Sequence, residues 1–286
     1  MKLCTFKTRA YSAAVGLVIG EHVVAIRDHF ADAPATMIDL IAEWDLWQKP
    51  LAELAASDVS GVPSSEVMLL APVPRPGKIL GIGLNYADHV EESGMGMPAD
   101  QLWFAMMSTA ANGPYAPIDL PKVSQALDYE AEMVFIVGKR GRHLSADNAR
   151  EAIFGYCVGN DVSVRDWQLR TSQFVLGKSF DTHAPFGPWI VTADEIADPH
   201  QLGIRCFVND EKRQDSNTAQ LIFNCYQQIE HLSKVMTLEP GDVIFTGTPG
   251  GVGVGFKPPR WLREGDRVRV EIDGLGMLEN QVRAEV

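Results

Sequence analysis

The stretch Leu127–Gly138, LDYEAEMVFIVG, combines the pattern of a buried strand with two acidic side chains. Its second half is apolar and rich in β-branched residues, which favours a strand inside the core. Glu130 and Glu132 stand two positions apart, so their carboxylates point to the same side, about 7 Å apart at Cα. Two like charges on a core strand are costly unless a positive charge lies between them. The alternative for this pattern alone is a solvated edge strand with two surface glutamates.

The composition limits the partners that this chain can have. Its 286 residues, 46% of them hydrophobic, are typical of a globular protein, and the net charge of −12 disfavours nucleic acid and anionic membranes. The four cysteines are widely spaced and include no C-x-x-C pair, so we expect reduced thiols and no zinc site. The sequence shows neither a signal peptide nor a membrane-spanning apolar run. We therefore expect a cytoplasmic protein without a membrane partner.

A proline-rich segment, APVPRPG, divides the chain at residues 71–77. Its three prolines at alternate positions favour an extended linker, because each fixes its own φ and restricts the residue before it. We expect residues 1–70 to form a small N-terminal α/β domain and residues 71–286 a larger domain with many strands and few helices. The expected N-terminal elements are a hairpin over Ala13–Ile19 and His22–Ile26 and helices over Met37–Leu46 and Pro50–Ala56.

The larger domain places a third carboxylate on a second apolar strand. This strand is expected over Tyr156–Val164, between helices over Ala146–Phe154 and Gln220–Val235. Asp161 then joins Glu130 and Glu132 on two strands that we expect to be neighbours. A hard divalent cation such as Mg²⁺ or Mn²⁺ would explain why a core tolerates three carboxylates, because these ions prefer oxygen ligands and leave room for substrate oxygens.

A short helix with a histidine and a glutamate is predicted over Tyr86–Ser93. His89 and Glu92 stand at i and i+3, so they share one face of this helix. The glycine-rich segment Gly94–Pro98 ends the helix in a mobile connection. The short helix and this loop together predict a lid over a binding site. The alternative is an ordinary surface pair that adds a few tenths of a kcal/mol to helix stability.

Five ordered motifs make the chain recognisable. They are GLNYADHVEE (Gly83–Glu92), LDYEAEM (Leu127–Met133), GNDVSVRDWQ (Gly159–Gln168), GKSFDT (Gly177–Thr182) and EPGDVIFTGTPGGVG (Glu239–Gly253). Through them the sequence resembles the fumarylacetoacetate hydrolase family over roughly residues 70–286. The resemblance implies an α+β fold: a β-rich, mixed β-sandwich roll with a small N-terminal domain. It does not specify a substrate, because the family includes C–C hydrolases, decarboxylases, isomerases and hydratases.

The resemblance also implies roles for individual residues. The metal ligands would be Glu130, Glu132 and Asp161, with Mg²⁺ or Mn²⁺ as the cofactor. Lys178 would bridge the metal carboxylates and the substrate oxyanion. His89 and Glu92 would activate a water molecule, Gln168 would point a polar group at the substrate, and Thr248 would bind the substrate carboxylate. Tyr86 and Arg165 would line the pocket, or serve a structural role instead.

Two positions depart from the family pattern. Many relatives have a lysine in the segment that is WFAMMSTAANGP here (Trp103–Pro114), so we expect apolar surface in its place. His183 follows the GKSFDT motif where a small or apolar residue would be expected, and it would either contact the distal end of the substrate or cap a turn. Both differences concern the substrate and leave the metal chemistry unchanged.

The sequence thus predicts a metal-dependent hydrolase that cleaves a C–C bond in a 2,4-dioxo acid, such as an acylpyruvate, fumarylpyruvate or a dioxo sugar acid. The products would be pyruvate and a carboxylate, after attack of an activated water on the acyl carbonyl. The enzymatic alternative is a decarboxylase, isomerase or hydratase of a related 2-oxo acid. The non-enzymatic alternative is an idle protein that binds metal and a 2-oxo acid without turnover. The resemblance further implies a homodimer.

Overall fold

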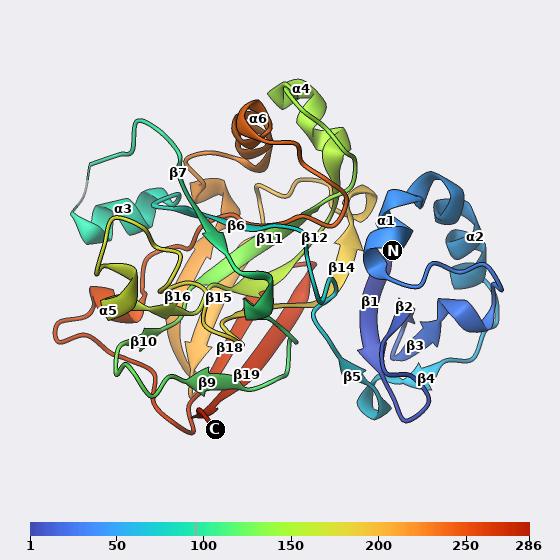
Figure 1. Ribbon diagram of the computed structural model, residues 1–286, viewed down its shortest axis with the longest axis horizontal. Coiled ribbons are helices and arrows are strands. Elements are labelled where there is room, and N and C mark those ends of the chain that lie inside the picture. Colours follow the sequence, from blue (N-terminus) through green and yellow to red (C-terminus); the bar gives the residue numbers. More distant parts are fainter. Residues whose placement is uncertain (95) are drawn as a thin grey trace.

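A large open sheet runs through the computed structural model, which describes residues 1–94 and 96–286 (Figure 1). Met95, in the predicted lid loop, lies outside the described residues. In spatial order the strands are β4 (Val62–Pro63), β3 (His22–Ala25), β2 (Ala14–Ile19), β1 (Lys2–Lys7), β14 (Ala184–Thr192), β12 (Ile153–Asn160), β11 (Ala131–Val137), β17 (Val243–Phe245), β6 (Ile79–Gly83) and β7 (Leu102–Met106). In addition, β5 (Met68–Leu69) pairs with β1, and β8 (Ala111–Asn112) pairs with β14.

A second sheet packs against the middle of the first. Its strands, in order, are β16 (Glu211–Asn217), β15 (Gly203–Val208), β18 (Arg267–Ile272), β19 (Gly276–Ala284) and β9 (Ile118–Leu120), while β10 (Leu127–Asp128) and β13 (Ser163–Val164) form a separate pair. Phe135 of β11 lies in the core between the sheets together with Ile204 of β15. Ile136, the next residue of β11, packs on the opposite face with Leu40. The predicted strand is therefore covered on both faces, as its apolar run indicated.

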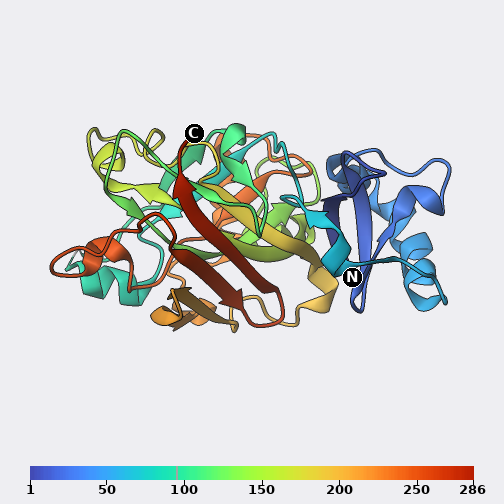
Figure 2. The ribbon, with the colours of Figure 1, turned by 90° about the horizontal axis from the view of Figure 1, so that it is seen from below.

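The N-terminal strands extend the large sheet, because β1 pairs with β2 on one side and β14 on the other. Figures 1 and 2 both place this unit at one end of the molecule. The predicted hairpin is present as β2 and β3, but the prediction that the second helix begins at Pro50 is wrong. The helices are α1 (Met37–Ala42) and α2 (Trp44–Ala56). Trp47 and Leu51 bury one face of α2, and this packing outweighs the hydrogen bond lost at Pro50. The division at 70/71 stays a prediction.

The remaining helices are few and short, and two of them differ from their predicted bounds. They are α3 (Ala87–Ser93), α4 (Ala146–Ala149), α5 (Arg165–Gln168) and α6 (Cys225–Val235). The helix predicted over Ala146–Phe154 is shorter, because Ile153 and Phe154 already belong to β12. The helix predicted from Gln220 starts later, at a capping box formed by Asn224 and Gln227.

Short 3₁₀ turns complete the chain at Ile26–Asp28, Ser64–Glu66, Ser108–Ala110, Arg150–Ala152, Ala193–Glu195, Thr218–Gln220 and Gly253–Gly255. The prediction of a β-rich α+β fold with few helices is confirmed, and neither sheet closes into a barrel. All four cysteines are buried and free, as expected. Among the described residues, no helix has the length and apolar character needed to span a bilayer.

Candidate active site

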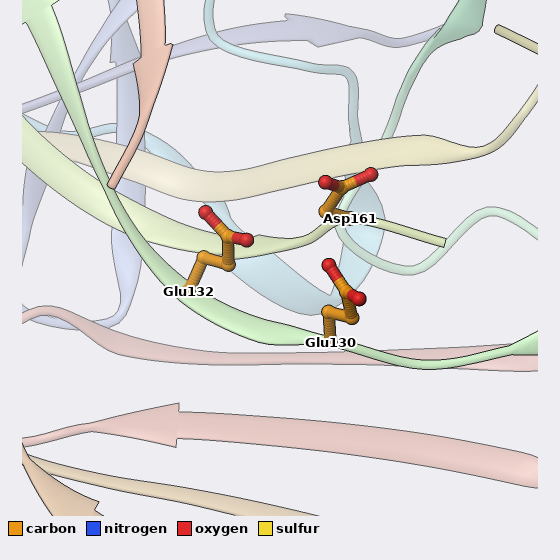
Figure 3. A group of neighbouring side chains, drawn as sticks. All are labelled: Glu130, Glu132 and Asp161. Carbon is orange, nitrogen blue, oxygen red and sulfur yellow. The ribbon is translucent and has the colours of Figure 1, made fainter. Parts of the chain in front are cut away.

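Three carboxylates meet at one end of the central strands β11 and β12. Glu130 precedes β11, Glu132 belongs to it, and Asp161 follows β12. The two strands are antiparallel, with Ala131 opposite Asn160, so the start of one lies beside the end of the other. One carboxylate oxygen from each acid lies within 4.8 Å of the others, and all three side chains are buried. Figure 3 shows the three carboxyl groups turned toward a common space.

Backbone N–H groups hold this carboxylate triad in place. The N–H of Glu130 donates to Asn160 Oδ1 (2.9 Å), and the N–H of Asp161 donates to the backbone oxygen of Glu130 (2.9 Å). The N–H of Gly247 donates to Glu132 Oε2 (2.7 Å). The triad is thus anchored by its own strands and by the loop after β17.

Two buried cations contact the triad. Lys178 Nζ donates to Glu130 Oε2 (2.7 Å) and to Asp161 Oδ2 (2.6 Å). Arg165 contacts Glu130 Oε1 (2.7 Å) and donates through Nε to Asp128 Oδ2 (2.8 Å). Lys178 is therefore a bridge between two of the predicted ligands, which is where the family resemblance put it. Arg165 orients Glu130, and its own guanidinium charge is paired with Glu130 and Asp128.

These cations compensate the three acids unequally. Burial opposes ionisation of Glu130, but Lys178 and Arg165 outweigh it and lower the pKa of Glu130 to about 2. Burial and the neighbouring carboxylates raise the pKa of Glu132 well above its usual range. Burial, reinforced by Glu130 and only partly offset by Lys178, raises the pKa of Asp161 to about 7. The protein's own cations therefore stabilise the ionised form of Glu130, whereas ionisation of Glu132 and Asp161 would be favoured by a further cation.

The donor set fits a hard divalent ion. It consists of carboxylate oxygens alone, and Asp161 Oδ1 is buried without a hydrogen-bond partner in the described part of the chain. Mg²⁺ and Mn²⁺ are bound by such oxygen sets, in which few protein ligands leave positions for substrate oxygens. Glu130, Glu132 and Asp161 could therefore hold either metal.

Glu130 and Glu132 of the triad, together with Lys178, line the floor of a cavity of about 470 Å³. Gln168 and Thr248 line it beside the acids, and α3 contributes His89 and Glu92. Gln168 Oε1 accepts a bond from Arg165 (2.9 Å), and Thr248 Oγ1 accepts one from Gln214 (2.8 Å). The remaining wall is largely apolar and includes Leu102, Phe104, Leu169, Phe174, Val252 and Val254, and Lys257 also lines the cavity.

The predicted pair on α3, His89 and Glu92, lies close together but is not hydrogen-bonded. His89 Nδ1 lies 3.8 Å from Glu92 Oε2, and it has no hydrogen-bond partner among the described residues. Glu92 Oε2 instead accepts the N–H of Gly251 at 2.8 Å. Asp88 of the same helix accepts a hydrogen bond from Ser216 Oγ. The acids of α3 therefore dock this helix on the glycine loop and on β16.

Two predicted substrate contacts lie away from the cavity wall in the described structure. Tyr86 is fully buried and belongs to the same core cluster as Phe135 and Ile204. His183 is buried as well: its ring stacks on Phe180, and Nε2 donates to the backbone oxygen of Asp119 (2.8 Å). Their burial accords with the structural alternative given for Tyr86 and with a role of His183 in holding the local chain, and a contact of either side chain with the substrate stays a prediction. Arg165 does line the cavity, although its guanidinium is bound to protein groups.

The structure adds cavity residues that the sequence did not single out. Lys257 follows the glycine-rich loop, and Leu102 and Phe104 come from β7, with Phe104 inside the segment Trp103–Pro114 where apolar surface was predicted. Gln214 supports Thr248 from behind, on the neighbouring strand β16. None of these residues lies in a spacing pattern of its own, so only the proximity of separate elements reveals them.

The sequence and the structure of this chain are similar to those of known enzymes. Residues 78–283 match the model of the fumarylacetoacetate (FAA) hydrolase C-terminal family. Oxaloacetate tautomerase FAHD2A, mitochondrial, from Bos taurus is 43% identical over 251 residues, which are 87% of this chain and 80% of that protein. The structure of maleylpyruvate hydrolase from Sphingobium sp. SYK-6 with manganese (II) ion and pyruvate is 33% identical, with a TM-score of 0.85. That of 5-carboxymethyl-2-hydroxymuconate delta-isomerase from Mycobacterium smegmatis is also 33% identical, with a TM-score of 0.79, and both matches cover all of both chains. The chain therefore belongs to the fumarylacetoacetate hydrolase family.

Proposed function

We propose that this enzyme interconverts the enol and keto forms of a 2-oxo dicarboxylic acid such as oxaloacetate, with Mg²⁺ or Mn²⁺ as its cofactor. The observation that supports this most directly is that His89, whose Nδ1 has no hydrogen-bond partner among the described residues, lines the same cavity as Glu130 and Glu132 of the carboxylate triad. The relative named as an oxaloacetate tautomerase is 43% identical across most of this chain, which adds weight to tautomerisation over the other family reactions.

Binding of a 2-oxo acid would use both the floor and the loop of the cavity. Glu130, Glu132 and Asp161 would hold the metal, which supplies positive charge against the negative charge that develops on the 2-oxo group. Thr248 lines the cavity next to the triad and would contact the substrate carboxylate. Burial opposes the charge on Lys178, but Asp161 and Glu130 outweigh it and raise the pKa of Lys178 above its usual value. Lys178 therefore remains a cation and adds to the same electrostatic stabilisation.

His89 would transfer the proton. In the enol-to-keto direction, the C2 hydroxyl loses its proton and C3 gains one, so no water, oxidant or second substrate is consumed. Imidazole is the side chain most often used for such transfers near neutral pH. His89 is on α3, directly over the cavity, and its Nδ1 is not engaged by another protein group among the described residues. It can therefore take up and deliver this proton without first breaking an internal hydrogen bond.

A dicarboxylic substrate would explain the third cation of the cavity. Arg165 and Lys178 are paired with buried carboxylates of the protein. Lys257 is exposed, and the part of the chain that the structure describes offers it no ion pair. A second carboxylate on the substrate could pair with Lys257 while the first lies near the triad. The apolar wall between them suits the carbon chain of the substrate.

Hydrolysis of a C–C bond in a 2,4-dioxo acid is the second candidate. His89 and Glu92 are neighbours on the cavity wall, and a structural relative is named as a maleylpyruvate hydrolase. Hydrolysis also requires activation of water, for which the 3.8 Å between His89 Nδ1 and Glu92 Oε2 would have to shorten to a hydrogen bond. Tautomerisation needs no such rearrangement, so the observed geometry favours it. Decarboxylation and hydration have no separate support in the cavity.

One pair of assays separates the two candidates. Chelator-stripped protein would be mixed with the enol form of oxaloacetate, with and without Mn²⁺, and the loss of enol absorbance followed. In parallel, pyruvate release from acetylpyruvate would be measured. We expect metal-dependent loss of the enol and little pyruvate release. Pyruvate release without faster loss of the enol would reject the tautomerase in favour of the hydrolase, and inactivity in both assays despite Mn²⁺ binding would indicate the idle protein.

A homodimer and a cytoplasmic location remain predictions. Light scattering on the purified protein would test the first, and imaging of the tagged protein in its native cell the second.

A further inference from the structure

Gln214 connects two walls of the cavity from behind. It lies on β16, the edge strand of the second sheet, and its side chain is only 1% exposed. Its Oε1 accepts the N–H of Ala131 (2.9 Å), and its Nε2 donates to Thr248 Oγ1 (2.8 Å) and to the backbone oxygen of Pro249 (2.8 Å). One side-chain amide therefore uses its acceptor and both donors at once.

The hydrogen bonds of Gln214 join two parts of the candidate site, the segment of Ala131 and the loop of Thr248. Ala131 lies between Glu130 and Glu132, so its N–H belongs to the segment that positions two of the three triad acids. Thr248 lines the cavity on the loop that also bonds Glu132 through Gly247. A shift of the Gln214 amide would therefore move the triad and the substrate loop relative to each other.

The same strand also contacts the third wall of the cavity. Ser216, two residues after Gln214 and on the same side of β16, donates a hydrogen bond from its hydroxyl to Asp88 of α3. Strand β16 thus touches the triad strand, the substrate loop and the helix with His89. No other amide side chain in the described structure bonds both to the triad segment and to Thr248.

We propose that Gln214 is a positioning residue that sets the spacing between the metal-ligating segment and the substrate loop. It touches neither the metal nor the substrate and acts through Ala131 and Thr248. This inference rests on the proposed function, because it assumes that the triad binds a divalent ion and that Thr248 binds substrate. Orienting groups behind the ligands of a metal site commonly change metal affinity when they are removed, roughly 10- to 100-fold.

The decisive variant is Gln214→Met, which keeps the length of the side chain and removes all three hydrogen bonds. Mn²⁺ affinity would be measured by calorimetry, and then the affinity of the Mn²⁺-loaded protein for oxalate, a planar dianion that resembles the 2-oxo acid group. We expect both affinities to fall, that for Mn²⁺ by roughly 10- to 100-fold. Wild-type affinity for both probes in the folded variant would overturn the proposal.

Gln228→Met is the matched control. Gln228 is also a fully buried glutamine, and its Nε2 donates to the backbone oxygen of Phe223 (2.8 Å), with no hydrogen bond to the triad or to Thr248 in the described structure. Its replacement removes a buried amide from α6, so it measures the general effect of such a loss. We expect unchanged affinity for Mn²⁺ and oxalate. Equal losses in both variants would mean that Gln214 contributes only to folding.

Two further variants keep the proposal testable if Gln214→Met does not fold. Gln214→Glu at pH 8 retains an acceptor for Ala131 but loses the donors to Thr248 and Pro249, so oxalate affinity should fall more than Mn²⁺ affinity. Thr248→Val removes only the hydrogen bond between Gln214 and Thr248 on the substrate loop, so it should lower the affinity for oxalate and leave that for Mn²⁺ unchanged. In the double variant Gln214→Glu/Thr248→Val, the oxalate effects should not add, because the two residues share one interaction. Additive effects would contradict the coupling.

The wild-type measurement separates this inference from the proposed function. If the wild-type protein fails to bind Mn²⁺, the metal-dependent function is rejected and the role of Gln214 with it. If the wild-type protein binds Mn²⁺ and oxalate and the Gln214 variants bind them equally well, only the inference about Gln214 fails.

Discussion

The two sides of the cavity differ in how firmly they are built. On the triad side, Glu132 and Asp161 are at most 1% exposed and are held by backbone N–H groups and by Lys178. On the opposite side, the side chains of His89 and Glu92 are 17% and 35% exposed, and Lys257 lies open to solvent. A buried charged cluster tolerates few changes, because any lost partner leaves an unpaired charge in the core. The exposed side can change residues at little cost in stability.

This difference suggests how one fold can serve several reactions. Relatives of this chain are named as a tautomerase, a hydrolase and an isomerase. If the triad side supplies the metal chemistry, the exposed side selects the proton transfer and the substrate. Variants on the two sides should therefore separate metal binding from turnover.

The largest expected effect is on the triad side. Glu132→Gln keeps the shape and the bond from Gly247 but removes a charged ligand. We expect Mn²⁺ affinity to fall by more than roughly 100-fold, above what the loss of a supporting residue costs, and metal-dependent activity to disappear. Calorimetry with Mn²⁺ would measure this, with Glu92→Gln as the control from the other side of the cavity. Retained Mn²⁺ affinity would remove Glu132 from the ligand set.

His89→Gln should lower the rate of turnover without lowering the affinity for Mn²⁺. Loss of the proton carrier should slow the enol–keto conversion by roughly 100- to 10,000-fold, while Mn²⁺ affinity stays unchanged because the triad is untouched. Stopped-flow absorbance would follow the enol. A variant as fast as the wild type would show that another group transfers the proton.

Glu92→Gln sharpens the choice between the two reactions. The amide oxygen can still accept the N–H of Gly251, so α3 should stay docked, with a loss of about 1 kcal/mol from the weaker neutral acceptor. For a tautomerase, the rate should fall less than roughly tenfold. A loss as large as that of His89→Gln would indicate that both residues work as a dyad and would support the hydrolase.

Lys257→Met should affect substrate choice alone. A partly exposed charge pair contributes up to about 1 kcal/mol, so KM for oxaloacetate should rise by up to roughly fivefold with kcat almost unchanged. The wild-type KM should also rise with salt, and this dependence should weaken in the variant. Lys49→Met, on the exposed face of α2, is the control. An unchanged KM would place the second carboxylate elsewhere.

The smallest effect concerns a titratable group in the core. Burial lowers the pKa of His183 from 6.5 to about 4, so the folded protein keeps this ring neutral while the unfolded chain takes up a proton below 6.5. Stability from this residue is therefore complete above pH 6.5 and is lost as the pH falls toward 4, by about 0.8 kcal/mol at pH 6. Urea unfolding at pH 8 and pH 6 would be measured for the wild type and for His183→Gln, which can still donate to Asp119. The raised pKa of Asp161 acts in both proteins, so the difference between their pH dependences isolates His183. The same change in both proteins would contradict the assignment.

Much of this protein followed from local patterns in the chain. The apolar run of Leu127–Gly138 indicated a core strand, and the spacing of Glu130 and Glu132 put both carboxylates on one side, because side chains alternate along any strand. The i, i+3 spacing likewise put His89 and Glu92 on one face of α3. The hairpin of β2 and β3 was also predicted, because turn and strand signals are local.

Tertiary structure decided which groups meet. Glu92 bonds to Gly251 across 159 positions of the chain, and Gln214 reaches Ala131 across 83. The burial of His183, like that of Tyr86, and the continuation of α2 through Pro50 also depend on packing against distant elements. Periodicity reports the geometry of one backbone segment, whereas these contacts depend on the order and register of strands far apart in sequence. The chain by itself therefore determined which side chains share one side of a strand or one face of a helix, and the fold determined the partners of each of these groups.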